Sequence, residues 1–355
     1  MSLEKSSETP LLPHSKGRRG QHYAAPLVTG FIFGFGLGTV LLSFTSQPIQ
    51  QSLPVPLIHS SENTNISQEV STQHLNEDYV HLDLDPQGLA NQVRVLCWIM
   101  TSPSNHKTRA VHVKRTWGKR CNILLFMSTA NDTELQSVAL NNLREGRRYL
   151  WAKTKEAFKY IYQNYFDKAD WFVKADDDTY VIMENLRLFL KDKDPKAPIY
   201  FGCKFKEPTT QQIYMSGGAG YVLSKEALQR FVEKAIPSKE KCWGLDDGNE
   251  DFEIGRCLQS VGVEAGDSRD SLGRYRFLAY DLEKHLIPGE MNSERWYSEY
   301  IYYPQKEGAN CCSDTVVSFH YIMPNTMYIL EYLLYSLKHF VRTWNQTVLI
   351  DDEKL

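Results

Sequence analysis

The 355-residue sequence has no large excess of either charge. Its 40 Lys and Arg residues nearly balance 43 Asp and Glu residues and leave a formal net charge of -3. It also lacks a basic tract dense enough to attract a nucleic-acid backbone. Cysteine is scarce, with seven residues, and no two of them form a C-x-x-C pair. These absences argue against nucleic acid as a partner, and against a small disulfide scaffold, a zinc ribbon or a thioredoxin-like redox site.

Charged residues are missing altogether between Arg19 and Glu62, and residues 24–44 within this gap are almost wholly apolar. At 1.5 Å rise per residue the stretch covers about 31 Å, close to the hydrocarbon thickness of a bilayer. No small-residue cleavage site follows it, so we predict an uncleaved signal anchor rather than a cleaved signal peptide. Basic residues directly precede the span, which makes residues 1–23 the cytoplasmic tail of a single-span type II membrane protein.

Residues 45–90 are rich in Ser, Gln, Asn and Pro and show little periodicity, which is typical of a flexible lumenal stem. N-glycosylation sequons at Asn65, Asn131 and Asn345 all fall on the lumenal side of this topology. Glycines repeat every four residues at positions 30, 34 and 38 of the span. This repeat favours close helix pairing in a homodimer, or it simply reflects how common glycine is in membrane helices.

From residue 91 to residue 355, which we expect to be the catalytic domain, apolar runs alternate with amphipathic ones. VRVLCWIM from Val93, ILLFMS from Ile123, WFVKA from Trp171 and IYFG from Ile199 indicate buried strands. Residues 107–119, 151–166, 184–191 and 224–235 have helical spacing, and Ser224 is placed to cap the last of these helices. The alternation predicts an α/β domain of nucleotide-binding type with a mainly parallel sheet.

Three adjacent carboxylates, Asp176, Asp177 and Asp178, directly follow the apolar run WFVKA. They should therefore lie at the carboxyl end of a buried strand, where open α/β sheets bind their ligands. Carboxylate oxygens prefer hard cations such as Mg²⁺ or Mn²⁺, and a bound cation relieves the repulsion among the three acids. The pattern thus predicts a metal site rather than a solvated acidic turn.

Two further segments have features of a site. Glu250 and Asp251 open the amphipathic run EDFEIGRCL, which predicts a short helix whose dipole favours ionised carboxylates in its first turn. Farther upstream, Gly217, Gly218 and Gly220 lie within eight residues, and such a run allows the backbone to approach a ligand closely.

A D-x-D motif after an apolar strand is typical of nucleotide-sugar transferases of the GT-A fold, and longer segments are more specific. They include HVKRTWGKRC, ADWFVKADDDTYVIMENLR, YMSGGAGYVLSKEALQRFV, EDFEIGRCL and CCSDTVVSFHYIMPNTMYILEYLLY. Together they span Val93 to Tyr335 and resemble the core 1 β1,3-galactosyltransferase family, within the inverting enzymes of glycosyltransferase family 31. The resemblance implies Mn²⁺-dependent transfer of galactose from UDP-galactose to the 3-hydroxyl of GalNAc on Ser or Thr of glycoproteins, in the Golgi membrane.

The resemblance also implies a role for individual residues. The metal ligands would be Asp176, Asp178 and His320, and the general base would be Asp251, with Glu250 as the fallback. The donor sugar nucleotide would contact Thr101, Lys114, Asp177, Gly217 and Gly218. The acceptor would contact Tyr214, Trp296 and Tyr297.

Six cysteines match family positions and allow three disulfides in an oxidising lumen: Cys97, Cys121, Cys242, Cys257, Cys311 and Cys312. Cys97 with Cys121 is the expected first pair because it joins neighbouring strand ends, whereas the other four can pair in more than one way. Cys203 matches no family cysteine, so we expect either a free thiol or an intermolecular bond.

Three other functions fit much of this pattern. A lumenal chaperone of the transferase is one, but the intact acidic triplet at 176–178 argues against it. A glycan-binding protein without catalysis is the second. The third is a family 31 transferase with another donor sugar, such as GlcNAc or glucuronic acid, and the sequence does not exclude it.

The chain departs from its family on the acceptor side. Where family members carry paired histidines and an F-W-Y-W run, this chain has Lys284 for the first His, Arg295 for the Phe and Ser298 for the second Trp. Aromatic rings present large apolar faces to a sugar, so the loss of a Trp removes contact area. The departures predict an acceptor that is held differently or more weakly.

We therefore expect this chain to turn over simple GalNAc-peptides slowly, and we expect Ser298→Trp to raise the rate by restoring an aromatic face. Initial rates with UDP-galactose and a GalNAc-Thr peptide, measured for both proteins, check this expectation. A wild-type rate as high as that of ordinary family members would contradict an altered acceptor site.

Overall fold

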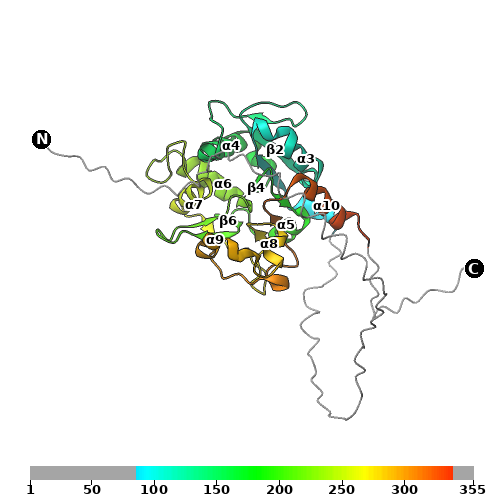
Figure 1. The fold of residues 1–355 in the computed structure, drawn as a ribbon. Coiled ribbons are helices and arrows are strands. Elements are labelled where there is room, and N and C mark those ends of the chain that lie inside the picture. Colours follow the sequence, from blue (N-terminus) through cyan, green and yellow to red (C-terminus); the bar gives the residue numbers. More distant parts are fainter. Residues whose placement is uncertain (1–84, 339–355) are drawn as a thin grey trace, which may run out of the picture. The chain divides into compact units, whose positions relative to one another are not determined.

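The computed structural model describes residues 85–338 (Figure 1). The predicted tail, the predicted span at 24–44 and most of the predicted stem lie outside these residues. Within the described part, no helix is both long and apolar enough to cross a membrane. The described chain opens with α2 (Pro86–Gln92), which overlaps the last residues of the predicted stem and is capped by the Asp85 carboxylate.

A seven-stranded sheet with the order β10-β6-β9-β4-β1-β2-β3 forms the centre of the domain. Four strands confirm the predicted ones: β1 (Val95–Met100), β2 (Ile123–Ser128), β4 (Trp171–Asp176) and β6 (Ile199–Gly202). The others are β3 (Val138–Ala139), β9 (Tyr221–Ser224) and β10 (Glu264–Ala265). β1 pairs in parallel with β2 and β4, whereas β9 is antiparallel to β4 and β6. The sheet is therefore mixed but mainly parallel.

The predicted helices are present, although two of them are divided. The first consists of η3 (His106–Ala110), α3 (Val111–Arg115) and η4 (Trp117–Arg120). The next two are α4 (Leu150–Tyr165) and α5 (Met183–Leu190). The last consists of α6 (Lys225–Arg230) and η7 (Phe231–Ala235), and Ser224 caps it by accepting a hydrogen bond from the Ala227 N–H.

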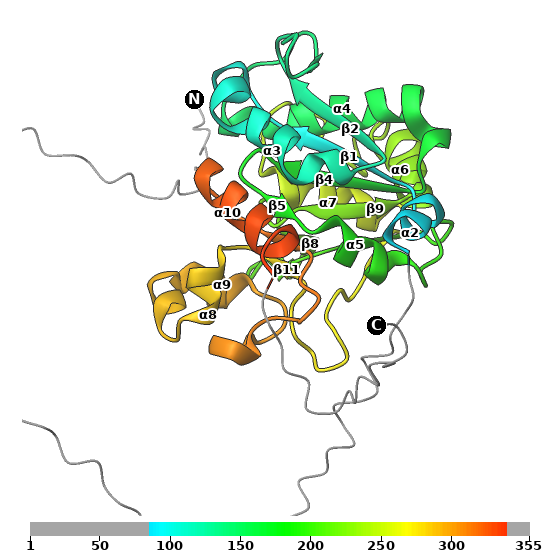
Figure 2. The same cartoon turned by 90° about the vertical axis from the view of Figure 1, so that its right-hand side faces the viewer.

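Helices cover both faces of the sheet. Successive side chains of a strand point to opposite faces, so each strand contributes to two cores. On β1, residues 95, 97 and 99 pack into one core with α2, α3 and α5. Residues 96, 98 and 100 pack into a second core with α4, α6 and α7 (Glu250–Ser260). In Figure 1 the strands lie between α4, α6 and α7 on one side and α3 and α5 on the other, and Figure 2 looks onto the side of α3 and α5. Two apolar cores thus hold the carboxyl ends of β1 and β4 in place.

Smaller elements complete the domain. β5 (Tyr180–Val181), β12 (Ser318–Phe319) and β11 (Phe277–Leu278) form a three-stranded sheet, and β7 (Lys204–Lys206) pairs with β8 (Ile213–Met215). The remaining longer helices are α8 (Leu282–Leu286), α9 (Arg295–Tyr300) and α10 (Pro324–Tyr335). Antiparallel pairing of β12 with β5 brings the segment around Phe319 beside the residues that follow β4.

The disulfides follow the prediction and resolve the pairing that the sequence left open. Cys97 bonds to Cys121, as expected, and the other pairs are Cys242–Cys257 and Cys311–Cys312. Cys203 is a free, buried thiol, which favours the predicted free thiol over an intermolecular disulfide. Burial raises the pKa of this thiol to about 12.

Candidate active site

A cavity of about 480 Å³ opens where β1 and β4 end, the edge at which open α/β sheets bind ligands. Its lining comes from segments that are far apart in the sequence, and it gathers most of the residues predicted from the motifs. The predicted residues that line it are Thr101, Asp176, Asp177, Asp178, Gly217, Gly218, Glu250, Asp251 and His320.

Asp176, Asp178 and His320 form the one group of potential metal ligands found in the described residues, with ligand atoms within 4.8 Å of one another. His320 directly follows β12, and nearby the Ile322 N–H donates to the Asp178 carbonyl at 2.8 Å. The His320 Nε2 lies 3.4 Å from the Asp178 Oδ1. Two carboxylates and an imidazole are a donor set that fits a divalent cation such as Mn²⁺.

The three acids of the triplet differ in environment. Asp177 accepts hydrogen bonds from Thr101 Oγ1 at 2.7 Å and Asn105 Nδ2 at 3.0 Å, and burial raises its pKa to about 6. Burial alone would also raise the pKa of Asp178, but its hydrogen bond and charge interaction with His320, aided by Arg109, hold that pKa below its ordinary value. Asp177 therefore binds the loop after β1, whereas Asp178 faces His320 and Arg109.

Gly217 and Gly218 are required by packing inside the site, and not only by the approach of a ligand. A β-carbon on Gly218 would lie 2.0 Å from His320 Cε1, and one on Gly217 would lie 2.8 Å from Glu250 Oε2. These distances are too short for any real side chain. Both glycines thus make room for other side chains of the same site.

Glu250 and Asp251 begin α7, as predicted, but they are held in different ways. Glu250 accepts hydrogen bonds from Thr154 Oγ1 at 2.8 Å and Tyr221 OH at 2.6 Å. Asp251 accepts from the backbone N–H groups of Gly217 at 3.1 Å and of Phe252 at 2.9 Å. Glu250 is thus anchored by side chains, whereas Asp251 is anchored by backbone N–H groups.

The expected effect of the helix dipole on these two carboxylates needs correction. Burial raises the pKa of Asp251 and of Glu250, although the nearby Lys174 ammonium opposes the shift in both. Desolvation is therefore the largest influence on the pKa of both carboxylates. A raised pKa makes an ionised carboxylate a stronger proton acceptor.

Sequence reasoning missed four basic residues that line the cavity, Arg109, Arg147, Lys153 and Lys174, and two of them contact the acidic triplet directly. Lys174, on β4, is only 2% exposed, and its Nζ lies 2.6 Å from Asp176 Oδ1 and 3.0 Å from the Gly217 carbonyl oxygen. A lysine inside the apolar run WFVKA was the available signal, since a buried lysine is almost always paired. Arg109, on η3, places its Nη1 2.8 Å from Asp178 Oδ2.

The structure does not bring every predicted contact to the cavity. Lys114 does not line it and instead donates to the Glu134 carbonyl at 2.6 Å, so Arg109 is the basic residue that this segment contributes. Tyr214 is buried between Phe205 and Phe252, with ring centroids 5.8 Å from each.

A series of contacts between aromatic rings leads from His320 to Trp296 and Tyr297. The Tyr321 ring stacks on His320 with centroids 3.8 Å apart, and Tyr280 lies 5.4 Å from Tyr321. Tyr280 in turn contacts Trp296 and Tyr297 at 6.1 and 5.7 Å. The predicted acceptor residues Trp296 and Tyr297 are thus connected to the cavity by ring contacts but do not line it.

Comparison with known proteins agrees with the fold and the site. Residues 91–270 match the model of the Fringe family, described as Fringe-like. The chain is 46% identical over 313 residues to a Xenopus laevis glycoprotein-N-acetylgalactosamine 3-beta-galactosyltransferase 1, covering 87% of this chain and 82% of that protein. It is also 27% identical to a mouse beta-1,3-glucosyltransferase over 46% of this chain and 33% of that protein. A mouse chondroitin sulfate synthase 3 is 27% identical over 46% of this chain and 20% of that protein.

An acidic site at the strand ends of a mainly parallel sheet, together with these matches, defines the chain as a glycosyltransferase. It belongs to the Fringe-like enzymes of glycosyltransferase family 31 and, among them, to the core 1 β1,3-galactosyltransferase family that its motifs resemble. The alternative of a non-enzymatic chaperone or glycan-binding protein is set aside by this assignment.

Gly218→Ala should displace the His320 ring and lower the affinity for Mn²⁺ by about 10- to 100-fold, the usual effect of disturbing the support of a metal ligand. Gly244→Ala is the matched control, because a β-carbon there would meet only Lys239 Cγ at 3.6 Å, an ordinary contact. Titration of Mn²⁺ by electron paramagnetic resonance measures both affinities. Equal affinities of the two variants would show that His320 is not a ligand.

Proposed function

We propose that this enzyme transfers galactose from UDP-galactose to the 3-hydroxyl of GalNAc on Ser or Thr of glycoproteins, with inversion at the anomeric carbon and with Mn²⁺. The observation that carries the proposal is the meeting of Asp176, Asp178, His320 and Asp251 in one cavity. The 46% identity to a protein named for this acceptor and sugar supports it.

Asp176, Asp178 and His320 would hold the cation, which when bound would neutralise charge on the departing diphosphate. Asp251 would take the proton of the acceptor hydroxyl, since its carboxylate lines the cavity and burial raises its pKa. The Gly217 N–H holds the Asp251 Oδ2, and Lys174 holds the Gly217 carbonyl. These bonds would keep the base in a constant orientation during attack.

On the acceptor side, Trp296 and Tyr321 are 44% and 49% exposed and offer aromatic faces for a sugar. Lys284, one of the departures from the family, donates to Ser293 Oγ at 2.8 Å and lies 3.2 Å from Glu294 Oε1. Glu294 also accepts from Tyr280 OH at 2.9 Å. A second candidate function is therefore a paralogue that holds its acceptor differently or more weakly, since Lys284 changes the contacts beside Tyr280.

We further propose that residues 24–44 anchor the enzyme in the Golgi membrane with the catalytic domain in the lumen. The three disulfides support this placement, because disulfides persist in oxidising compartments.

Asp178→Ala should abolish transfer, because it removes one of three candidate ligands, and EDTA should do the same to the wild type. Release of UDP and transfer of radiolabelled galactose report turnover. Asp192→Ala is the matched control, since the Asp192 side chain is 81% exposed and does not line the cavity. Full activity of Asp178→Ala, or of wild type in EDTA, would contradict metal dependence.

Asp251→Asn should lower kcat by about 10² to 10⁴-fold and leave UDP binding intact, as expected for loss of a general base. The wild-type rate should fall as the pH falls through the raised pKa of Asp251, at a higher pH than for an exposed aspartate. Steady-state kinetics across pH, with UDP affinity measured by calorimetry, test this. If Glu250→Gln is inactive and Asp251→Asn is active, the base is Glu250 instead.

A further inference from the structure

Charged side chains of both signs line the metal-ligand cavity, and one of the basic ones lacks a partner. Six carboxylates and four basic side chains give the cavity a formal charge of -2. Three of the basic side chains form ion pairs: Arg109 with Asp178, Lys174 with Asp176 and Lys153 with Glu145. The fourth, Arg147, is exposed, and its side chain forms no ion pair or hydrogen bond within the described part of the chain.

The segment directly before Arg147 is fixed to the ends of two strands. The Glu145 carboxylate accepts a hydrogen bond from Thr129 Oγ1, just after β2, and lies 2.9 Å from Lys153 Nζ. Lys153 is only 2% exposed, and it also donates to the Thr101 carbonyl, just after β1, at 2.8 Å. Arg147 therefore lines the cavity from an anchored loop.

The charge of Arg147 acts on the side of the cavity that holds the candidate metal ligands. Burial raises the pKa of Tyr321, and the Arg147 guanidinium is the strongest influence that opposes this shift. The Tyr321 ring stacks on His320 with centroids 3.8 Å apart. Arg147 begins the turn before α4, whereas His320 and Tyr321 follow β12. The fold thus brings an unpaired cation near the metal-ligand group.

The charge balance indicates which ligand this cation would take. A divalent cation on the three candidate ligands would bring the formal charge of the cavity from -2 to zero. A nucleoside diphosphate sugar then adds a negative charge on each of its phosphates. Because the other basic side chains already have carboxylate partners, Arg147 is the one left for these charges. A guanidinium suits them, since it binds two phosphate oxygens at once through charge-assisted hydrogen bonds.

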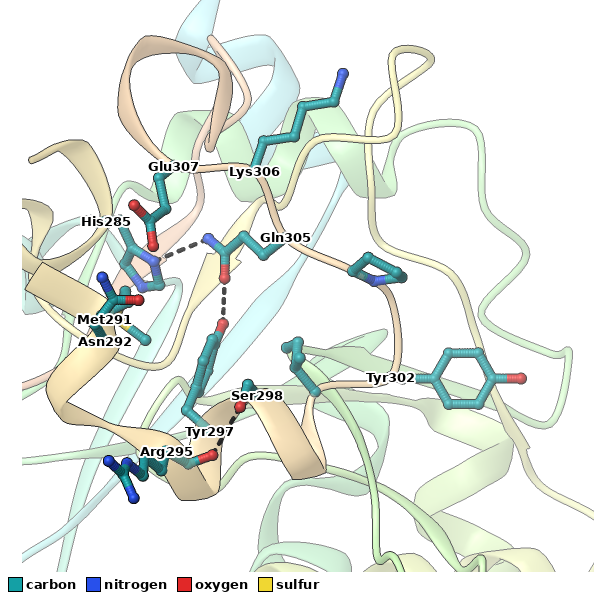
Figure 3. A pocket seen from close by; sticks show the side chains of 12 residues that line it. His285, Met291, Asn292, Arg295, Tyr297, Ser298, Tyr302, Gln305, Lys306 and Glu307 are labelled. Carbon is teal, nitrogen blue, oxygen red and sulfur yellow. Dashed lines mark hydrogen bonds between the residues drawn. The ribbon is translucent and has the colours of Figure 1, made fainter. Parts of the chain in front are cut away.

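Another cavity, of about 500 Å³, does not offer an equivalent place for a diphosphate. It lies between α8, α9 and the segment after α9 (Figure 3), and it shares no lining residue with the metal-ligand cavity. Its basic residues Arg295 and Lys306 extend in different directions in Figure 3, and the Glu307 carboxylate also lines it. Among the described residues, the group of potential metal ligands lies in the cavity of Arg147 instead.

We propose that Arg147 binds the diphosphate of the donor and gives the enzyme its preference for nucleoside diphosphates over ligands without phosphate. The inference rests on the proposed function only for the class of donor, a nucleotide sugar. It adds a residue to the donor site that neither the motifs nor the family resemblance indicated.

Arg147 should also contribute to the rate of transfer. In that step the acceptor oxygen bonds to the anomeric carbon and gives its proton to Asp251. The bond between that carbon and the diphosphate oxygen breaks, and its electron pair stays on the oxygen. The departing nucleoside diphosphate thereby gains a negative charge, so its contact with Arg147 strengthens as the bond breaks. Loss of Arg147 should therefore lower kcat as well as donor affinity.

Isothermal titration calorimetry on the purified full-length protein with Mn²⁺ tests the binding step, with UDP, GDP and uridine as probes. In Arg147→Ala the Kd for UDP should rise by about 10- to 100-fold, the usual effect of losing a hydrogen bond between charged groups. The Kd for uridine should not change, because uridine has no phosphate. Arg147→Lys keeps the charge without the planar fork, so its Kd for UDP should lie between those of the wild type and Arg147→Ala.

Arg148→Ala is the matched control. Arg148 is the next residue of the same loop, its side chain is 72% exposed, and it does not line the cavity. Its exposed ion pair with Asp247 should contribute little to stability, so this variant should bind UDP as the wild type does. Circular dichroism melting checks that each variant folds.

Four results would overturn the inference: no binding of UDP or GDP to the wild type, an unchanged Kd for UDP in Arg147→Ala, an equal loss of uridine binding, or an equal loss in Arg148→Ala. A separate transfer assay with UDP-galactose and a GalNAc-Thr peptide distinguishes these failures from failure of the proposed function. Nucleotide binding that depends on Arg147, without galactose transfer, would refute only the proposed function. Galactose transfer with unchanged kcat and KM in Arg147→Ala would refute only the role of Arg147.

Discussion

The site depends on one buried cation. Lys174 reaches Asp176 at 2.6 Å and lies 3.8 Å from Glu250, and it also donates to the Gly217 carbonyl. Burial would lower the pKa of Lys174, but the surrounding carboxylates raise it above its ordinary value, so the ammonium stays charged. Removing one partner of a buried ion pair costs about 3–5 kcal/mol. Lys174 thus offsets the repulsion among the carboxylates that converge on it.

The topology then decides which segments meet at that cation. β9 runs antiparallel to β4, with Tyr221 opposite Lys174, so the glycine run just before β9 lies at the carboxyl end of β4. Antiparallel pairing of β12 with β5 brings His320 to the same edge. An all-parallel sheet would have placed the start of β9 at the opposite edge. The antiparallel strand is therefore part of how the site is built.

The sequence alone was sufficient for features that are local. The long apolar runs predicted β1, β2, β4 and β6, and the acidic triplet after β4 predicted where the site would lie. β9 was not identified as a strand, because YVLS is short and merges with the cap of the next helix. His320 was found only through the family resemblance, and Lys174 and Arg109 were missed, since their partners are distant in sequence and are brought together by tertiary folding. Desolvation of Asp251 could not be foreseen either, because burial depends on how α7 packs.

The central claim is that this cavity catalyses galactose transfer to GalNAc. A panel of UDP-sugars, offered to the purified full-length enzyme with a GalNAc-Thr glycopeptide in the presence and absence of Mn²⁺, tests it most directly. The account predicts that UDP-galactose is the preferred donor, that the product is a β1,3-linked disaccharide, and that omission of Mn²⁺ stops the reaction. Preference for UDP-GlcNAc, UDP-glucuronic acid or UDP-glucose, or equal turnover without a divalent cation, would contradict it.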